Sequence, residues 1–156
     1  MSTNPTDVVN DFLQNTAPDK VEAAARRLVA DDATYISLNF ENPELKQILP
    51  WTGTSKGQQA LINTFTDLAK VWKIEEFTVM DLFGAGEDVA AFGSMTYRSI
   101  SLGKVFRSPF AIHAKVRNGK IVFFQFMEDS FASSRSFSSG GKWTIKREPH
   151  GASYEV

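Results

Sequence analysis

Apolar residues recur every three or four positions between residues 6 and 30, which predicts two amphipathic helices separated by a break at Ala17-Pro18. Asp19 and Glu22 have the spacing of a capping box, in which two side chains satisfy free backbone N–H groups at the start of a helix. The second helix is therefore expected to begin at Asp19.

Two further helices are predicted before residue 73. A short one runs from residue 43 to 49 between two prolines, and a long one carries apolar residues at helical spacing up to about residue 72. Ser55 and Gln58 form a second candidate capping box at the start of the long helix. These helices contain enough apolar surface to cover one face of a sheet.

The period changes to two over residues 31–40 and again after residue 74, which predicts strands. The pair Asn118-Gly119 is typical of a tight hairpin turn. Four consecutive antiparallel strands are expected at 74–83, 88–100, 104–117 and 120–128. Helices first and strands afterwards indicate an α+β fold with the helices on one face of the sheet.

The strand IVFFQFMED (residues 121–129) is apolar on both faces. Glu128 falls on the same face as Phe124 and Phe126, which we expect to meet the helices. The opposite face needs another cover, and an exposed apolar face of this kind usually marks an interface. We therefore expect a homodimer through the outer sheet face, with four interface residues: His113, Phe123, Gln125 and Met127.

Length and composition set limits on the kind of protein. The 156 residues suffice for one domain, expected over 1–147 and followed by a polar tail, 148–156. A net charge of −1 gives no basic surface for nucleic acid, and no apolar run is long enough to span a membrane, so neither is expected as a partner. The N-terminus lacks the pattern of a secretory signal, so a cytoplasmic location is expected.

The sequence lacks the residues that most kinds of catalytic site require. Cysteine is absent, and the histidines at 113 and 150 are far apart, so neither thiol chemistry nor a metal site is expected, and no cofactor is predicted. The glycines of GAGED stand between two strands, where a hairpin turn is expected rather than a nucleotide-binding loop. Acid–base chemistry remains, with Glu128 as the candidate catalytic acid. Asp129 is expected to cap the segment that follows it.

Four segments, VVNDFLQ, LVADDATYISL, PWTGTSKGQQALINTF and RNGKIVFFQFMEDSF, resemble the SnoaL-like and ketosteroid isomerase-like proteins of the nuclear transport factor 2-like (NTF2-like) superfamily. The resemblance covers about residues 6 to 135. It implies a cone-shaped, cystatin-like fold in which three N-terminal helices pack on a strongly curved antiparallel sheet and leave a pocket at the wide end. It also implies pairing of two copies through the outer sheet face.

The resemblance does not carry over the known catalytic groups. The tyrosine and the base of ketosteroid isomerases fall on Phe12 and Ser37, and their second acid falls near Ile112. The aspartate that cyclases and epoxide hydrolases place on the last strand falls on Phe126. Steroid isomerisation by the mechanism of these relatives is therefore not expected.

Two kinds of function remain open. The first is binding of a small apolar or aromatic molecule in a cavity of about 300–1,000 Å³. The second is an enzyme of the isomerase, cyclase, hydrolase or dehydratase class, with displaced acid–base residues around Glu128 and tyrosines nearby. A filled cavity would instead indicate a protein–protein interaction module. The residues expected to line the pocket are Phe12, Tyr35, Ser37, Trp51, Phe65, Tyr97, Phe124 and Phe126.

Overall fold

The computed structural model describes residues 3–156 and contains helices and strands in a mixed order. The helices are α1 (Pro5–Leu13), α2 (Val21–Leu28), α3 (Pro43–Ile48), α4 (Gln58–Val71) and α5 (Ser130–Arg135). The strands are β1 (Val29–Ser37), β2 (Gly53–Lys56), β3 (Trp72–Ala85), β4 (Asp88–Ser99), β5 (Val105–Arg117), β6 (Lys120–Glu128), β7 (Thr144–Ile145) and β8 (Tyr154–Glu155).

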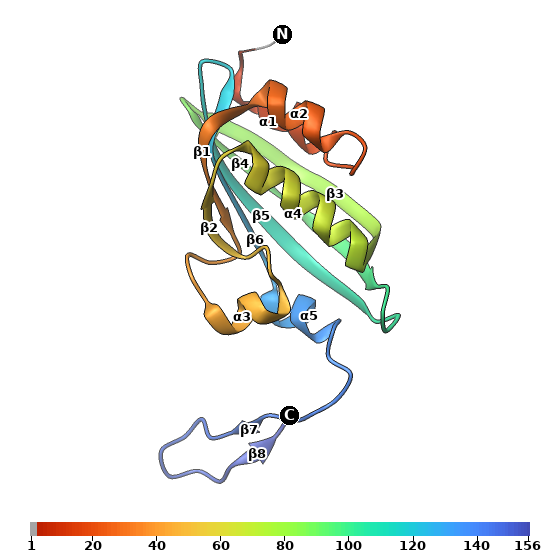
Figure 1. The fold of residues 1–156 in the computed structure, drawn as a ribbon. Coiled ribbons are helices and arrows are strands. Elements are labelled where there is room, and N and C mark those ends of the chain that lie inside the picture. The colour runs from red at the N-terminus through yellow and green to blue at the C-terminus, as the bar shows by residue number, and fades with distance from the viewer. Residues whose placement is uncertain (1–2) are drawn as a thin grey trace.

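Six strands form one curved sheet in the order β2-β1-β6-β5-β4-β3 (Figure 1). Helices α1, α2 and α4 cover one face of this sheet, which confirms the expected α+β cone. Neighbours from β3 to β6 are antiparallel, as predicted, but β1 pairs with β6 in parallel. A parallel neighbour requires a long connection, here supplied by everything between β1 and β6.

The hairpin between β5 and β6 sets which side chains face the helices. Asn118 and Gly119 both have positive φ angles, 51° and 74°, as a two-residue hairpin turn requires. Farther along the same pair of strands, Ile112 lies opposite Phe126 and His113 opposite Gln125. Between the turn and these pairs, a β-bulge shifts the register by one residue, so the turn and the bulge together direct alternate residues of β6 toward the helices.

Both predicted capping boxes are wrong. Helix α2 begins at Val21, and no side chain caps it. Ser55 lies in β2, where it pairs with Tyr35, so it is not available to cap a helix. Helix α4 follows Gly57, whose φ of 94° turns the chain sharply from strand to helix. Pairing with β1 therefore prevails over the local helix signal at this position.

Aromatic side chains fill the space between the helices and the sheet. Phe12 of α1 is fully buried and makes edge-to-face contacts with Phe65 of α4 and Phe124 of β6. On the same face of the sheet, toward its β3 edge, Phe77 of β3 stacks on Phe110 of β5 with 4.4 Å between ring centroids. A small space remains near the ends of β1, β4 and β6.

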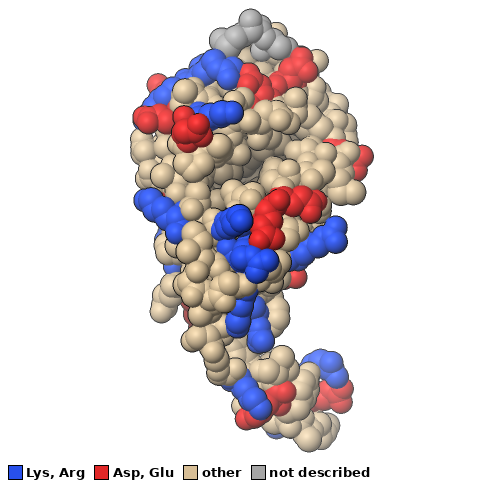
Figure 2. All heavy atoms as spheres, turned by 90° about the vertical axis from the view of Figure 1, so that its right-hand side faces the viewer, with Lys and Arg blue, Asp and Glu red and all other residues tan. Residues whose placement is uncertain are grey.

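The C-terminal segment forms a small hairpin, in which Thr144 pairs with Glu155 and Ile145 with Tyr154. It is separate from the six-stranded sheet and stands off one end of the body (Figures 1 and 2). The hairpin joins the end of the expected domain to the expected polar tail. On the face drawn in Figure 2, acidic and basic side chains are intermixed. No helix within residues 3–156 has the length and apolar character needed to span a membrane.

Candidate functional site

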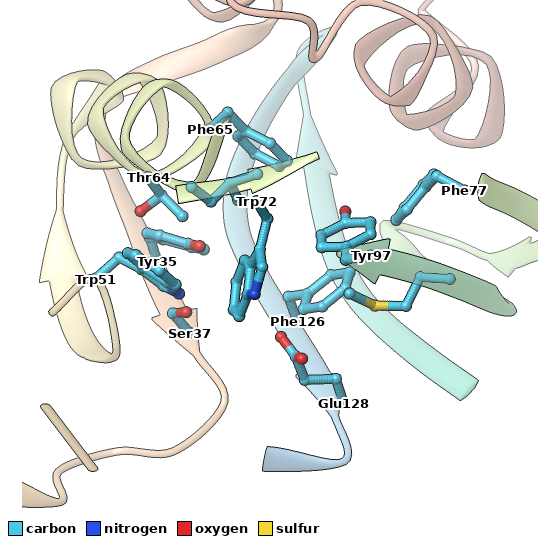
Figure 3. Close-up of a pocket in the computed structure, with 12 residues that line it drawn as sticks. Tyr35, Ser37, Trp51, Thr64, Phe65, Trp72, Phe77, Tyr97, Phe126 and Glu128 are labelled. Carbon is cyan, nitrogen blue, oxygen red and sulfur yellow. The ribbon is translucent and has the colours of Figure 1, made fainter. Parts of the chain in front are cut away.

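A small cavity of about 30 Å³ lies between α4 and the ends of β1, β3, β4 and β6 (Figure 3). Its wall is mainly aromatic, and its polar groups are hydroxyls, two indoles and one carboxyl group. The lining residues are Tyr35, Ser37, Trp51, Thr64, Phe65, Leu68, Trp72, Phe77, Met95, Tyr97, Phe126 and Glu128.

The structure brings six of the residues predicted for the pocket to this cavity wall: Tyr35, Ser37, Trp51, Phe65, Tyr97 and Phe126. For the two other predicted pocket residues, the expectation is wrong. Phe12 and Phe124 do not line the cavity, because each is fully buried and their rings pack against one another. They lie deeper in the cone, where α1 closes onto the sheet, and they belong to the hydrophobic core.

The cavity is much smaller than predicted. We expected about 300–1,000 Å³, the usual volume of a ligand site, and its volume of about 30 Å³ matches the space of a single water molecule. The expectation of a ligand-sized open pocket is therefore wrong for this conformation. The cause is Trp72, whose ring has neighbours on several sides, including Trp51 at 5.2 Å and Phe137 at 4.9 Å between centroids.

Glu128 is the one carboxyl group in the cavity wall. It is half-buried at the end of β6, and its carboxyl group points back toward the rings of Trp72 and Phe126 (Figure 3). Its Oε2 atom is fully buried and has no hydrogen-bond partner among the described residues. Burial raises the pKa of Glu128 from 4.5 to about 7, because the ionised form is poorly solvated there. The group can therefore both donate and accept a proton near neutral pH.

Two tyrosines flank the acid. Tyr35 is buried on β1, and its hydroxyl is hydrogen-bonded to Ser37 and Thr64. Burial raises the pKa of Tyr35 and of Tyr97, and the charge of Glu128 adds to this effect in both cases. Both phenols therefore stay protonated at neutral pH and can act as hydrogen-bond donors to an oxygen atom in the cavity.

Trp51 separates the cavity from the surface. Its side chain lines the inner cavity and also a surface groove of about 370 Å³, which Pro50, Val71 and Phe137 help to form. The residues on either side are anchored, since Leu49 is fully buried and the Thr52 hydroxyl donates to the Leu49 carbonyl at 2.9 Å. Trp51 therefore lies between the two spaces.

Sequence reasoning missed five residues of the wall: Thr64, Leu68, Trp72, Phe77 and Met95. The sequence pattern assigned Trp72 to the buried stripe of a helix, whereas it is the first residue of β3. Its indole N–H donates to the Ser136 hydroxyl at 2.8 Å, 64 residues away along the chain. No local signal could have revealed that contact.

The cavity has no evident place for a metal ion. Within residues 3–156, no three acidic, histidine or cysteine side chains are close enough to bind one. The cavity wall also contains no lysine, arginine or histidine. One carboxyl group, two phenols and two hydroxyls in an aromatic surround are suited to proton transfer and to hydrogen bonding of a small molecule.

The remaining predicted residues lie outside the cavity. Asp129 caps α5, since its Oδ1 accepts the N–H of Ala132 at 3.0 Å, as expected. His113 is on the outer sheet face, where its Nε2 lies 2.7 Å from Asp88 and its ring contacts Phe123. The other residues of the predicted interface, Gln125 and Met127, alternate with the inward residues of β6 and share this outer face.

Comparison with known structures identifies the fold. The chain has the NTF2-like fold, with a TM-score of 0.71 and 22% identity to an NTF2-like protein of Burkholderia xenovorans, over 88% of this chain and 99% of that chain. Other structures with this fold are classed with SnoaL-like polyketide cyclases or as ketosteroid isomerase-like. No family model matches the chain.

The comparison with curated proteins is more specific. The chain is 43% identical over 139 residues to patulin synthesis protein F of Aspergillus clavatus, covering 87% of this chain and 70% of that protein. It is also 43% identical over 128 residues to patulin biosynthesis cluster protein F of Penicillium expansum, covering 80% of this chain and 64% of that protein. The chain belongs to the family of patulin synthesis protein F.

Proposed function

We propose that this chain is a proton-transfer enzyme of small-molecule biosynthesis, with Glu128 as the acid–base residue. The observation that supports this proposal best is a carboxyl group in an aromatic cavity with a pKa of about 7 and a buried oxygen that has no partner. Perturbed acids of this kind are typical of general acid–base catalysis. The names of the two relatives, which refer to patulin synthesis, support a biosynthetic role.

The proposed reaction is isomerisation of a compound that contains a carbonyl group. The carboxylate of Glu128 takes a proton from the carbon beside the carbonyl, and the electrons of the broken C–H bond form an enolate. A phenol, from Tyr35 or Tyr97, donates a hydrogen bond to the enolate oxygen. Glu128 then returns the proton to another atom of the molecule, which restores the carboxylate and leaves substrate and product with the same composition.

Substrate entry is proposed to require displacement of Trp51. A cavity of about 30 Å³ cannot hold an organic molecule, whereas the adjoining groove provides about 370 Å³. Rotation of the indole toward the groove would join the two and bring a bound molecule to Glu128. The closed state excludes water, which strengthens hydrogen bonds to developing charge.

Hydrogen exchange into a simple ketone tests the proposed function. Cyclohexanone in D₂O should exchange the hydrogens beside its carbonyl faster with the protein present, followed by ¹H NMR. Exchange should rise with pH through about 7, because the carboxylate form of Glu128 is the base. Glu128→Gln should reduce the protein's contribution to the exchange rate about 10²–10⁴-fold. The control Glu41→Gln, at an exposed site, should keep the wild-type exchange rate. Equal exchange by the wild type and Glu128→Gln would refute the proposal.

The second candidate is binding without turnover. It is supported by the apolar residues at the positions where relatives have catalytic groups, namely Phe12, Ile112 and Phe126. In that case, the ligand would be a small apolar or aromatic molecule held by the cavity wall. Cyclohexanone would then bind, seen as ligand-detected NMR line broadening, without any protein-dependent exchange.

We also propose a homodimer through the outer sheet face. Large apolar side chains are exposed on it, including Met80, Phe83, Phe92 and Met127, and the rings of Phe83 and Phe92 stack at 6.1 Å. A self-complementary apolar surface is typical of a twofold interface. Light scattering at micromolar concentration should give twice the chain mass of 17.4 kDa. Phe92→Lys should give the monomer mass, and a monomeric wild type would refute the dimer.

A further inference from the structure

The turn after β6 places α5 directly beside Glu128. Asp129 follows Glu128 and caps α5, and its backbone N–H donates to the Ser108 hydroxyl at 2.8 Å. The direction of the chain is therefore fixed on both sides of the turn. The residue before a helix cap and the fourth residue of the helix commonly pack against each other, and here these are Glu128 and the fully buried Ser133. The Ser133 hydroxyl acts on the Glu128 carboxyl group as a hydrogen-bond donor.

The Ser133 hydroxyl has a second possible acceptor. Its Oγ lies 3.3 Å from the Ser130 carbonyl, a long distance for an O–H···O hydrogen bond. A buried serine in a helix often bonds only to such a carbonyl, which would make its role purely structural. Here, the weak local bond leaves the hydroxyl free to rotate toward the carboxylate of Glu128 when that group ionises.

A second serine of this segment holds the opposite wall of the cavity. The Ser136 hydroxyl donates to the Ser133 carbonyl at 2.6 Å and accepts the indole N–H of Trp72 at 2.8 Å. Ser136 is as deeply buried as Ser133 but no hydrogen bond joins it to Glu128. Because it holds a residue of the cavity wall, Ser136 is not a neutral control. Ser134 has a buried Oγ with no hydrogen-bond partner among the described residues and does not line the cavity, so Ser134→Ala is the matched control for removal of a buried hydroxyl.

From this arrangement, we infer that Ser133 is a positioning residue for Glu128: its hydroxyl donates to the carboxylate during the proton transfer and holds the carboxyl group toward the cavity. The inference rests on the proposed function. Ser133 lowers the pKa of Glu128, opposing burial and the nearby charge of Asp129. The other titratable groups facing Glu128 are Tyr35 and Tyr97, which stay neutral. The hydroxyl therefore keeps the acid from remaining protonated at neutral pH.

Carboxyl-labelled ¹³C NMR titration tests this inference, with the Glu128 signal assigned through Glu128→Gln. Ser133→Ala should raise the pKa of Glu128 by about 1, the effect of losing one hydrogen bond to a charged group. The pH profile of cyclohexanone exchange should move upward by the same amount. Ser134→Ala should leave both values as in the wild type.

The outcomes separate the two proposals. A Glu128 pKa that stays at the wild-type value in Ser133→Ala, with catalysis of exchange retained, would overturn the role of Ser133 alone. A wild type without catalysis of exchange would overturn the proposed function, whatever the titration gives. If Ser133→Ala does not fold, as its own NMR spectrum would show, Ser133→Cys keeps the side-chain volume with a weaker donor. It should produce an upward pKa change of the same sign, and no change would overturn the inference.

Discussion

Replacing Glu128 by Gln should make the stability of the protein less dependent on pH. The substitution keeps the shape of the side chain and removes its titrating proton. The wild-type group is held in a half-buried position among aromatic rings, where ionisation is disfavoured. The folded state therefore carries a cost at neutral pH that the unfolded chain, fully solvated, does not carry.

The size of this cost follows from the two pKa values. The pKa of Glu128 is about 7 in the folded protein, against an ordinary value of 4.5. Since a difference of one in pKa corresponds to about 1.4 kcal/mol, ionised Glu128 destabilises the folded state by about 3 kcal/mol. Below pH 4.5, the group is protonated in both states and the stability is fully present. This stability is lost as the pH rises from 4.5 through about 7, and above that pH ionised Glu128 imposes its full cost of about 3 kcal/mol.

Urea denaturation, followed by tryptophan fluorescence between pH 5 and pH 8, measures the effect. The free energy of unfolding of Glu128→Gln minus that of the wild type should increase by about 2–3 kcal/mol over this range. Taking the difference cancels the titration of all other groups. The exposed Glu41→Gln serves as the control, and its difference from the wild type should stay constant. A constant difference for Glu128→Gln would refute the claim that burial perturbs this acid.

Three further substitutions test the architecture. Gly93→Ala should lower the free energy of unfolding by more than about 3 kcal/mol in urea denaturation, because a Cβ there would lie 2.0 Å from the Thr78 carbonyl oxygen and 2.5 Å from the Phe110 ring; a loss below about 1 kcal/mol would contradict that packing. Asp129→Ala should cost about 1 kcal/mol, since the Ala132 N–H loses its cap, and Asp129→Asn, measured the same way, should recover most of it. Trp51→Ala should leave a folded domain by circular dichroism and open the cavity to the groove, so that apolar dyes gain fluorescence; unfolding would instead make Trp51 a core residue.

Much of the fold followed from patterns within short segments. The two-residue period of the strands and the Asn118-Gly119 turn predicted the pairing of β5 with β6. The β-bulge that shifts this pairing by one residue was not predicted, and it decides which face of β6 carries Glu128. Asp129 as a cap was likewise predictable, because capping depends on residues only three positions apart. The helix starts were less predictable, since Ser55 had two possible roles and strand pairing decided between them.

The location and size of the cavity depended on contacts between distant segments. Phe12, Phe124 and Phe126 all face inward, and no periodicity distinguishes a ring that fills the core from one that borders a cavity. The depth of each ring within the curved sheet makes that distinction, and this depends on where α1 and α4 pack.

The sequence by itself therefore determined most of the helices and strands and placed Glu128 on one face of its strand with Phe124 and Phe126, because these properties depend on neighbours along the chain. Only the tertiary structure decided that Trp72 and Trp51 nearly close the cavity and that burial moves the pKa of Glu128 to about 7. It also decided that Ser133 lies beside that acid. Packing and desolvation depend on residues that are far apart in sequence, and they arise only when the chain closes around them.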